Sequence, residues 1–305
     1  MRVLLIGGSG FVTGGIARLA RQAGHELVCA SRTGADDGRT HVRCDARQLA
    51  RSRDRLRAVR PDAVIHGVCY SRADAEELLA CFDDVPLVVL SSMDRYDGFA
   101  RAVAGEATGP HPTREDAVLA CDFAHQEERK GHPYDHNAMT DALDGGAAVL
   151  HLPMVYGPAD PQVAFRHGAL IHAALSGEPV ILGMGEAARI WTFGFVDDVA
   201  AACLHAVGHV GSWNVAETEL RTVREWAGLY GAEVVTVPDP WLDVDGPQPH
   251  LIADASAFAR DTGFVEPVGS VQGALRTLAW HRVHGIDAPS DLGERRAALE
   301  RWRRL

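Results

Sequence analysis

The chain has 305 residues, 47% hydrophobic and 23% charged, which suits one large α/β domain or a nucleotide-binding domain with a smaller second one. Its net charge of −11 argues against nucleic acid as a partner, because binding a phosphate backbone needs a basic face. The N-terminal apolar run is too short to span a membrane, and six scattered cysteines without CxxC pairs indicate a reduced, cytoplasmic protein.

The first half of the chain alternates apolar strands with helices. Strands are predicted at 3–7, 26–31, 40–45, 61–68, 86–92 and 147–153, and helices at 13–22, 46–59, 73–82 and from Tyr134 onward. Unbroken apolar runs such as VLLIG are typical of a parallel sheet that is buried on both faces. The alternation predicts an α/β fold with a doubly wound sheet.

The second half is less regular. A helix is predicted at 160–177, a strand at 178–183, a helix at 195–207 and a strand at 211–217. The segment 282–305 ends in a charged amphipathic helix, ERRAALERWRRL, which is expected on the surface or against a partner.

The stretch GGSGFVTGG follows the first strand and opens the first helix. Gly7 and Gly10 allow a tight turn and the close approach of a pyrophosphate, for which the helix N-terminus supplies N–H groups. Thr13 stands where such loops carry a third glycine. The position of the loop favours dinucleotide binding over a purely structural turn. The residues expected to contact the dinucleotide here are Gly7, Ser9, Gly10, Phe11 and Val12.

The second strand ends in Ser31 and Arg32, without the acidic residue that would bind a ribose 2′-hydroxyl. The two residues favour a 2′-phosphate, and therefore NADP as the cofactor, with NAD as the alternative. Arg32 could instead be a solvated loop residue. Asp45 and Ala46, at the end of the third strand, are expected near the adenine.

These motifs resemble the extended short-chain dehydrogenase/reductase family, also called the NAD-dependent epimerase/dehydratase family. The resemblance also rests on LSSMDRY (90–96), LPMVYGPAD (152–160) and FGFVDDVAAA (193–202), and it extends to about Trp280. It implies a Rossmann domain over 1–158, to which 193–217 return, and a smaller C-terminal substrate-binding part from 159–192 and 218–305. Members are often homodimers, which here would form through the Tyr134 helix and the helix at 73–82.

The family's catalytic set is a serine or threonine after the fifth strand together with Tyr-x-x-x-Lys. By resemblance, the serine falls on Ser92 and the tyrosine on Tyr134, but the lysine position holds Ala138. In the family this lysine binds the nicotinamide ribose and lowers the tyrosine pKa. Tyr134 is therefore expected to be a poor base that can still donate a proton. Asp94 and His136 are further catalytic candidates, although Asp94 is equally consistent with a solvated loop acid.

The resemblance also assigns the remaining contacts. Val68, Pro153 and Val155 are expected at the dinucleotide, although Val155 also suits the core. The residues expected at the substrate are Met93, Met154, Tyr156, Arg189 and Trp191. Trp191 stands where members that use sugar nucleotides carry an arginine, so an apolar or aromatic small molecule fits equally well. No metal is expected, because His132 and His136 have no evident third ligand.

The leading interpretation is an NADP-dependent oxidoreductase acting on a small biosynthetic intermediate. One alternative is a lyase, epimerase or isomerase on the same scaffold, with Asp94 or His136 as the base. The other is a dinucleotide-binding sensor without catalysis.

Overall fold

Seven short strands form one parallel sheet in the order β10-β6-β5-β4-β1-β2-β3. They are β1 (Arg2–Ile6), β2 (Glu26–Ser31), β3 (His41–Arg43), β4 (Ala63–His66), β5 (Leu87–Ser92), β6 (Ala148–Leu152) and β10 (Gly211–Asn214). The computed structural model describes residues 1–34, 40–103, 106, 112–242 and 249–304. The strand order reverses between β1 and β4, and a ligand crevice is expected at the carboxyl ends of these two strands.

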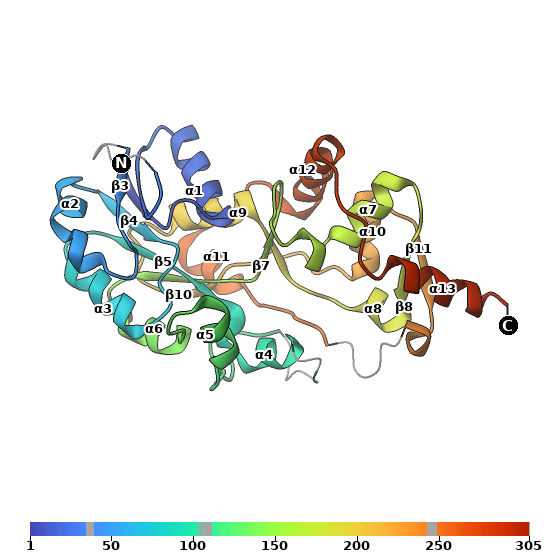
Figure 1. Cartoon of the computed structure of the whole chain (residues 1–305). Helices are drawn as coiled ribbons and strands as arrows, with labels where there is room; N and C mark the ends of the chain where they lie inside the picture. The colour runs from blue at the N-terminus through green and yellow to red at the C-terminus, as the bar shows by residue number, and fades with distance from the viewer. Residues whose placement is uncertain (35–39, 104–105, 107–111, 243–248, 305) are drawn as a thin grey trace.

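Helices cover both faces of this sheet, as Figure 1 shows. Helices α1 (Phe11–Gln22) and α9 (Val196–His205) pack together on one face, and α2 (Arg53–Ala58), α3 (Arg72–Cys81) and α6 (His136–Ala142) lie on the other. Alternate strand residues serve the two faces, because successive side chains of a strand point to opposite sides. Val3 and Leu5 belong to one apolar core, whereas Leu4 and Ile6 belong to the other. The predicted doubly wound, Rossmann-like α/β fold is confirmed.

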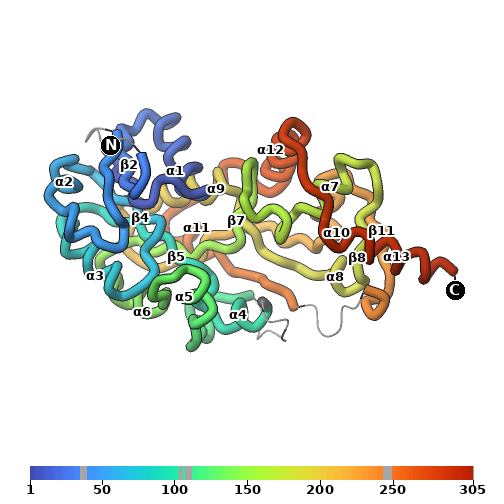
Figure 2. The backbone as a smooth tube through the Cα atoms, in the orientation of Figure 1, coloured from blue at the N-terminus to red at the C-terminus, as the bar shows by residue number. Residues whose placement is uncertain are grey.

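The rest of the chain extends away from the main sheet (Figure 2). It contains two parallel pairs, β8 (Val180–Gly183) with β11 (Val234–Val237) and β7 (Met154–Tyr156) with β9 (Phe193–Phe195). Its helices are α7 (Gly168–Ser176), α8 (Met184–Ala188), α10 (Val223–Tyr230), α12 (Gly269–His284) and α13 (Leu292–Trp302), whereas α11 (Ser256–Thr262) packs against β10 of the main sheet. The described residues include no helix that is both long and apolar enough to cross a membrane.

Two predicted helices had the wrong bounds. The segment 46–59 forms a turn, a short 3₁₀ helix at Leu49–Ser52 and then α2, because Asp45 accepts a hydrogen bond from the backbone of Arg47 and starts a turn there. Asp160 does the same two residues before Gln162, so regular helix in 160–177 begins only with α7. Side chains of aspartate compete in this way with the helical backbone.

Six α-helices among the described residues were not predicted. They are α4 (Asp97–Val103) and α5 (Ala124–Lys130) in the first half of the chain, and α8, α10, α11 and α12 in the second half. Helix α5 has no buried residue, so it lacks the apolar spacing by which a helix is recognised in a sequence.

Candidate functional site

The glycine loop after β1 forms a tight cradle at the point where the strand order reverses. Gly7 has φ +81°, and a Cβ there would lie 2.9 Å from Cγ2 of Val68, which follows β4. Only glycine combines this backbone conformation with so close a neighbour. The cradle therefore joins the carboxyl ends of β1 and β4.

Thr13 explains why a third glycine is not needed. Its hydroxyl donates to the carbonyl of Gly7 at 2.8 Å and accepts the N–H of Gly10 at 2.9 Å, so the side chain closes the loop. Helix α1 then begins at Phe11 with no acidic residue in its first turn. Its N-terminus is accordingly open to an anion.

Three of the predicted loop residues line one hollow. Ser9, Gly10 and Phe11 line it together with Arg18 and with Val196 at the start of α9. Val12 is half-buried against the core on the same face of the sheet. The hollow is thus bounded by the glycine loop on one side and by the first turn of α9 on the other.

A second pocket lies beyond β2 and β3 and is lined mainly by arginines. Arg32, which directly follows β2, and Asp45 both line it. The other basic residues of this arginine pocket are Arg43, Arg51 and Arg55. Sequence analysis had singled out only Arg32, because the arginine-rich segment after β3 is equally typical of a solvated helix. Ser31 donates a hydrogen bond to the carbonyl of Thr33 at 2.6 Å, and Ala46 packs against the core.

Tyr134 lies at the carboxyl end of β5, beside Ser92 and Asp94. Its hydroxyl donates to Oδ2 of Asp94 at 3.4 Å, an atom that also accepts from the side-chain amide of Gln126 at 3.1 Å. The backbone N–H of Asp94 donates to the hydroxyl of Ser92 at 3.2 Å. The structure therefore brings together three predicted residues, Ser92, Asp94 and Tyr134. The first two lie at the end of β5 and just after it, and Tyr134 lies in the segment before α6.

The surroundings of this group set its protonation. Burial raises the pKa of Tyr134 well above its usual value, and the nearby carboxylate of Asp94 raises it further. Burial also raises the pKa of Asp94, against the opposing effect of its hydrogen bond with Ser92. Desolvation disfavours the charged form of each group. Tyr134 is consequently a neutral phenol throughout the physiological pH range.

The prediction that Tyr134 starts a helix was wrong. Helix α6 begins at His136, and Asp135 is its N-cap, accepting hydrogen bonds from the backbones of Asn137 and Ala138 at 2.9 Å each. An aspartate with free backbone N–H groups two and three residues ahead is a strong cap. Tyr134 is therefore outside the helix, and Ala138 adjoins a shallow pocket that Asp74 of α3 also lines.

His136 lies behind the ring of Tyr134. The two rings meet edge to face with their centres 4.5 Å apart, and Nδ1 of His136 lies 3.2 Å from the hydroxyl of Ser91. Burial lowers the pKa of His136 to about 3, with smaller contributions from the charges of Lys130 and Arg95. Its imidazole is neutral near pH 7 and weakly basic, so its role as a base remains a prediction without support from this geometry.

Sequence analysis missed two residues of this site, Tyr70 and Lys130. The ring of Tyr70, two residues beyond Val68, lies 5.6 Å from that of Tyr134. Lys130, the last residue of α5, donates to the hydroxyl of Tyr70 at 3.3 Å. A signal was present, because Lys130 is the only lysine in the sequence, and the other 29 basic residues are arginines.

The predicted substrate residues divide between two places. Met93, Met154 and Trp191 share one apolar cluster, in which Met93 is fully covered. Tyr156 is also covered, and its hydroxyl donates to Glu217 at 2.8 Å. Pro153 directly precedes β7, and Val155 is the middle residue of this strand and belongs to the core.

Arg189 and Trp191 also line a cavity of about 500 Å³ between α7, α10 and the C-terminal segment. The guanidinium of Arg189 lies over the indole of Trp191, 3.8 Å from the ring centre. Nε of Arg189 is buried and has no hydrogen-bond partner among the described residues. A polar atom buried without a partner is costly, which makes this cavity a candidate for a polar ligand group.

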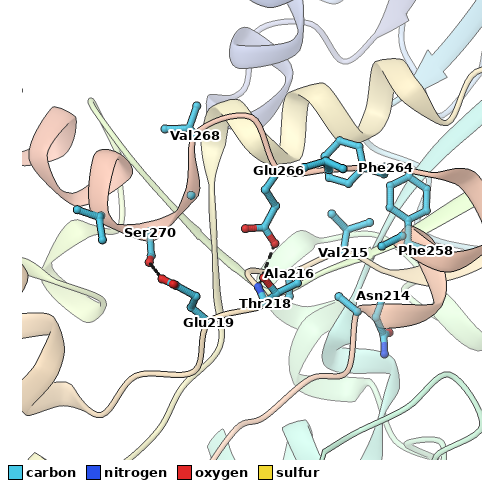
Figure 3. Close-up of a pocket in the computed structure, with 15 residues that line it drawn as sticks. Asn214, Val215, Ala216, Thr218, Glu219, Phe258, Phe264, Glu266, Val268 and Ser270 are labelled. Carbon is cyan, nitrogen blue, oxygen red and sulfur yellow. Dashed lines mark hydrogen bonds between the residues drawn. The ribbon is translucent and has the colours of Figure 1, made fainter.

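Another pocket, drawn in Figure 3, lies between the end of β10 and the segment before α12. Its two acidic side chains are tied to the protein. Glu266 accepts from the backbone of Thr218 at 3.0 Å, and Glu219 accepts from the hydroxyl of Ser270 at 2.9 Å. No predicted catalytic residue lines this pocket, so these contacts are assigned to holding two loops together. Among the described residues, no group of three potential metal ligands was found.

Comparisons with known proteins show the family to which the chain belongs. A profile described as the NAD dependent epimerase/dehydratase family matches residues 3–216. The 2′-dehydrokanamycin reductase of Streptomyces kanamyceticus is 31% identical over 210 residues, which cover 66% of this chain and 56% of that enzyme. The match thus spans little more than half the length of this relative.

Solved structures agree in fold. The dTDP-glucose 4,6-dehydratase of Bacillus anthracis, in complex with NAD, gives a TM-score of 0.68 at 14% identity, over 93% of this chain and 97% of that one. The UDP-glucose 4-epimerase of Thermotoga maritima, with UDP-glucose, gives 0.65 at 18% identity, over 93% and 99%. At such identities the likeness concerns the fold alone. Because the family profile matches the chain from β1 to the end of β10, the chain belongs to the NAD-dependent epimerase/dehydratase family.

Proposed function

We propose that this chain is an NADP-dependent oxidoreductase that reduces a carbonyl group of a small biosynthetic intermediate in the cytoplasm. The observation that carries this proposal is the neutral phenol of Tyr134, which lies with Ser92 and Asp94 beside the ring of Tyr70, two residues beyond the Val68 of the glycine cradle. Such a phenol can give a proton to a substrate oxygen. The similarity to an enzyme named as a reductase supports the same reaction type.

The residues present fit a nicotinamide dinucleotide. The glycine loop and the N-terminus of α1 suit its pyrophosphate, since Gly7 leaves no room for a side chain and no acid lies in the first helical turn. The arginine pocket suits a 2′-phosphate, which would distinguish NADP from NAD. When bound, the cofactor supplies the hydride.

The chain itself supplies the proton and the orientation of the substrate. Tyr134 donates its proton to the carbonyl oxygen, and the hydroxyl of Ser92 offers a second hydrogen bond to that oxygen. We assign the dinucleotide to residues 1–158 with 193–217, and the substrate to 159–192 with 218–305. Met154 and Trp191 offer apolar contacts on the substrate side, and Arg189 offers a cation.

The direct test follows NADPH absorbance while the protein is mixed with carbonyl compounds. 2′-Dehydrokanamycin is the first probe, because the reductase that resembles this chain is named after it. We expect oxidation of NADPH that depends on both protein and carbonyl, with slower oxidation of NADH. Tight cofactor binding without turnover on any of a panel of oxidised amino sugars and cyclic ketones would argue against a reductase.

A second candidate is an epimerase or lyase in which Asp94 removes a proton from carbon. The specific observation in its favour is the pKa of Asp94, which burial raises, because this makes the carboxylate a stronger base. In heavy water such an enzyme would transfer deuterium into its substrate without net consumption of NADPH, and Asp94→Asn would abolish the exchange. Exchange that survives in Asp94→Asn would exclude this assignment.

A further inference from the structure

The only lysine of the chain lies at the candidate active site. Lys130 ends α5, and the three residues after Gly131 bring the chain back to Tyr134. Gly131 permits this reversal because it adopts the left-handed conformation, with φ 60°. In a chain that uses arginine at its 29 other basic positions, one lysine at this place requires a specific explanation.

The ammonium group of Lys130 is held against Tyr70. Nζ donates to the hydroxyl oxygen of Tyr70 at 3.3 Å and lies 4.5 Å from the centre of its ring. The ring of Tyr70 in turn contacts the rings of Tyr134 at 5.6 Å and His136 at 6.1 Å. An ammonium is compact enough to bind one phenol oxygen while lying over the ring, whereas a guanidinium is wider and planar.

Several other charged or titratable groups lie around Tyr70 and Tyr134. Asp94 lies at the hydroxyl of Tyr134. Glu127 and Arg129 come from α5, and Glu127 accepts the backbone N–H of Tyr134 at 3.1 Å. His132 also lies near Tyr70. Its Nε2 is 3.1 Å from the carboxylate of Asp74, and we assign this pair to holding the segment before Tyr134 against α3.

The charge of Lys130 reaches the acidic group of the site. Burial is the largest influence on Asp94 and raises its pKa, and Lys130 is among the cations that oppose this rise. For His136, burial lowers the pKa and Lys130 lowers it further. The lysine thus favours an ionised carboxylate and a neutral imidazole around Tyr134.

We propose that Lys130 is the cationic positioning residue of the active site, which fixes the hydroxyl of Tyr70 and offsets the negative charge left on Tyr134 after its proton has passed to the substrate. This rests on the proposed reductase function. The lysine comes from α5, on the N-terminal side of Tyr134. Lys130 therefore does not occupy the family's lysine position, which is Ala138. Ala138 lies in α6 and adjoins the pocket at α3.

The first test uses Lys130→Met, Lys130→Arg and the matched charge control Arg282→Met, an exposed residue of α12. In the oxidative direction, which needs a deprotonated Tyr134, the positive charge of the oxidised nicotinamide would lower the pKa of this phenol, and Lys130→Met should move the rise of kcat with pH upward by about one unit. It should also lower kcat at neutral pH about tenfold or more. Lys130→Arg should keep most of the pH profile, and Arg282→Met should match the wild type. A lower kcat with an unmoved pH profile would reveal a merely structural lysine and overturn the proposal.

The second test needs no turnover. An amine-acetylating reagent can modify only Lys130 and the N-terminal amine, and mass spectrometry separates the two. NADP⁺ together with a substrate analogue should slow acetylation of Lys130 several-fold and leave the N-terminal amine unchanged. Equal rates with and without these ligands would place Lys130 outside the site and reject the proposal.

The two failures are distinguishable. A wild-type protein that reduces no carbonyl defeats the proposed function, and the acetylation experiment still decides whether Lys130 belongs to the site. An active wild type whose Lys130→Met variant keeps the same kcat and pH profile defeats only the assignment of Lys130.

Discussion

At the scale of single residues, the hydroxyl of Tyr134 is the group on which the chemistry depends. Tyr134→Phe removes only this hydroxyl and leaves the ring contacts with Tyr70 and His136 in place. We expect the reductive kcat to fall at least about 100-fold, a usual effect of losing a general acid, while the Kd for NADPH stays within about twofold. Steady-state kinetics and calorimetry measure the two. Full activity of the variant would transfer the role of proton donor to another group.

The wild type should also show a characteristic pH profile. Burial and the charge of Asp94 both raise the pKa of Tyr134, so the phenol stays protonated beyond the range in which a free tyrosine ionises. The reductive rate should therefore be flat from mildly acid to alkaline pH, with no fall near pH 10 while the fold persists. A fall in the reductive rate centred between pH 7 and 9 in the wild type would contradict this expectation. If the fall were absent from Asp94→Asn, the group that ionises would be Asp94 and not Tyr134.

At the scale of elements, the sequence was informative where periodicity and spacing determine structure. The apolar run before Gly7 and the glycine loop follow from local rules and lie where these rules predict, whereas Ser92, the last residue of β5, was identified by resemblance. The start of α6 was not predicted correctly. The sequence analysis began this helix at Tyr134, whereas Asp135 is its N-cap and the helix begins at His136. Lys130 was missed because its helix has no apolar face and no motif contains it.

The arginine pocket gives a prediction at this scale, since it combines β2, β3 and α2. Arg32→Ala and Arg51→Ala should each weaken NADPH binding about 10- to 100-fold, the effect of one charged hydrogen bond, and leave NADH binding nearly unchanged. Arg53→Ala removes the same charge from α2, outside this pocket, and serves as the control. Titration calorimetry with both cofactors measures the effect. Parallel losses for NADPH and NADH would show that the arginines do not recognise a 2′-phosphate.

At the scale of the whole molecule, assembly is the first expectation. Helices α3 and α6 pack against each other, and Met139 and Thr140 of α6 are buried within the monomer. Any dimer through this pair must therefore use their outer sides, which include Glu76 and Asp141. We expect light scattering to show a dimer at micromolar concentration, and Glu76→Arg to weaken it. A monomer at all concentrations would refute this expectation.

The last prediction concerns Glu217, which joins the main sheet to the smaller part of the chain. It follows β10, and its carboxylate accepts the hydroxyl of Tyr156 on β7 at 2.8 Å, while Oε2 is buried without a partner among the described residues. Burial raises the pKa of Glu217 to about 8, and the charges of Glu266 and Asp198 add to this. The folded state therefore holds a proton that the unfolded chain releases near pH 4.5.

A carboxyl whose pKa is raised by folding contributes stability below its unfolded pKa, and loses this contribution as the pH rises toward the folded value. The wild type should thus lose about 3–5 kcal/mol of unfolding free energy from this group between pH 5 and pH 9. Glu217→Gln keeps an oxygen for Tyr156 and cannot ionise, so it should match the wild type near pH 5 and exceed it near pH 9. Denaturant unfolding at both pH values measures this, with the exposed Glu233→Gln as the control. Equal pH dependence in wild type and Glu217→Gln would mean that Glu217 is ionised in the folded protein at pH 5, and that its buried oxygen is solvated by water.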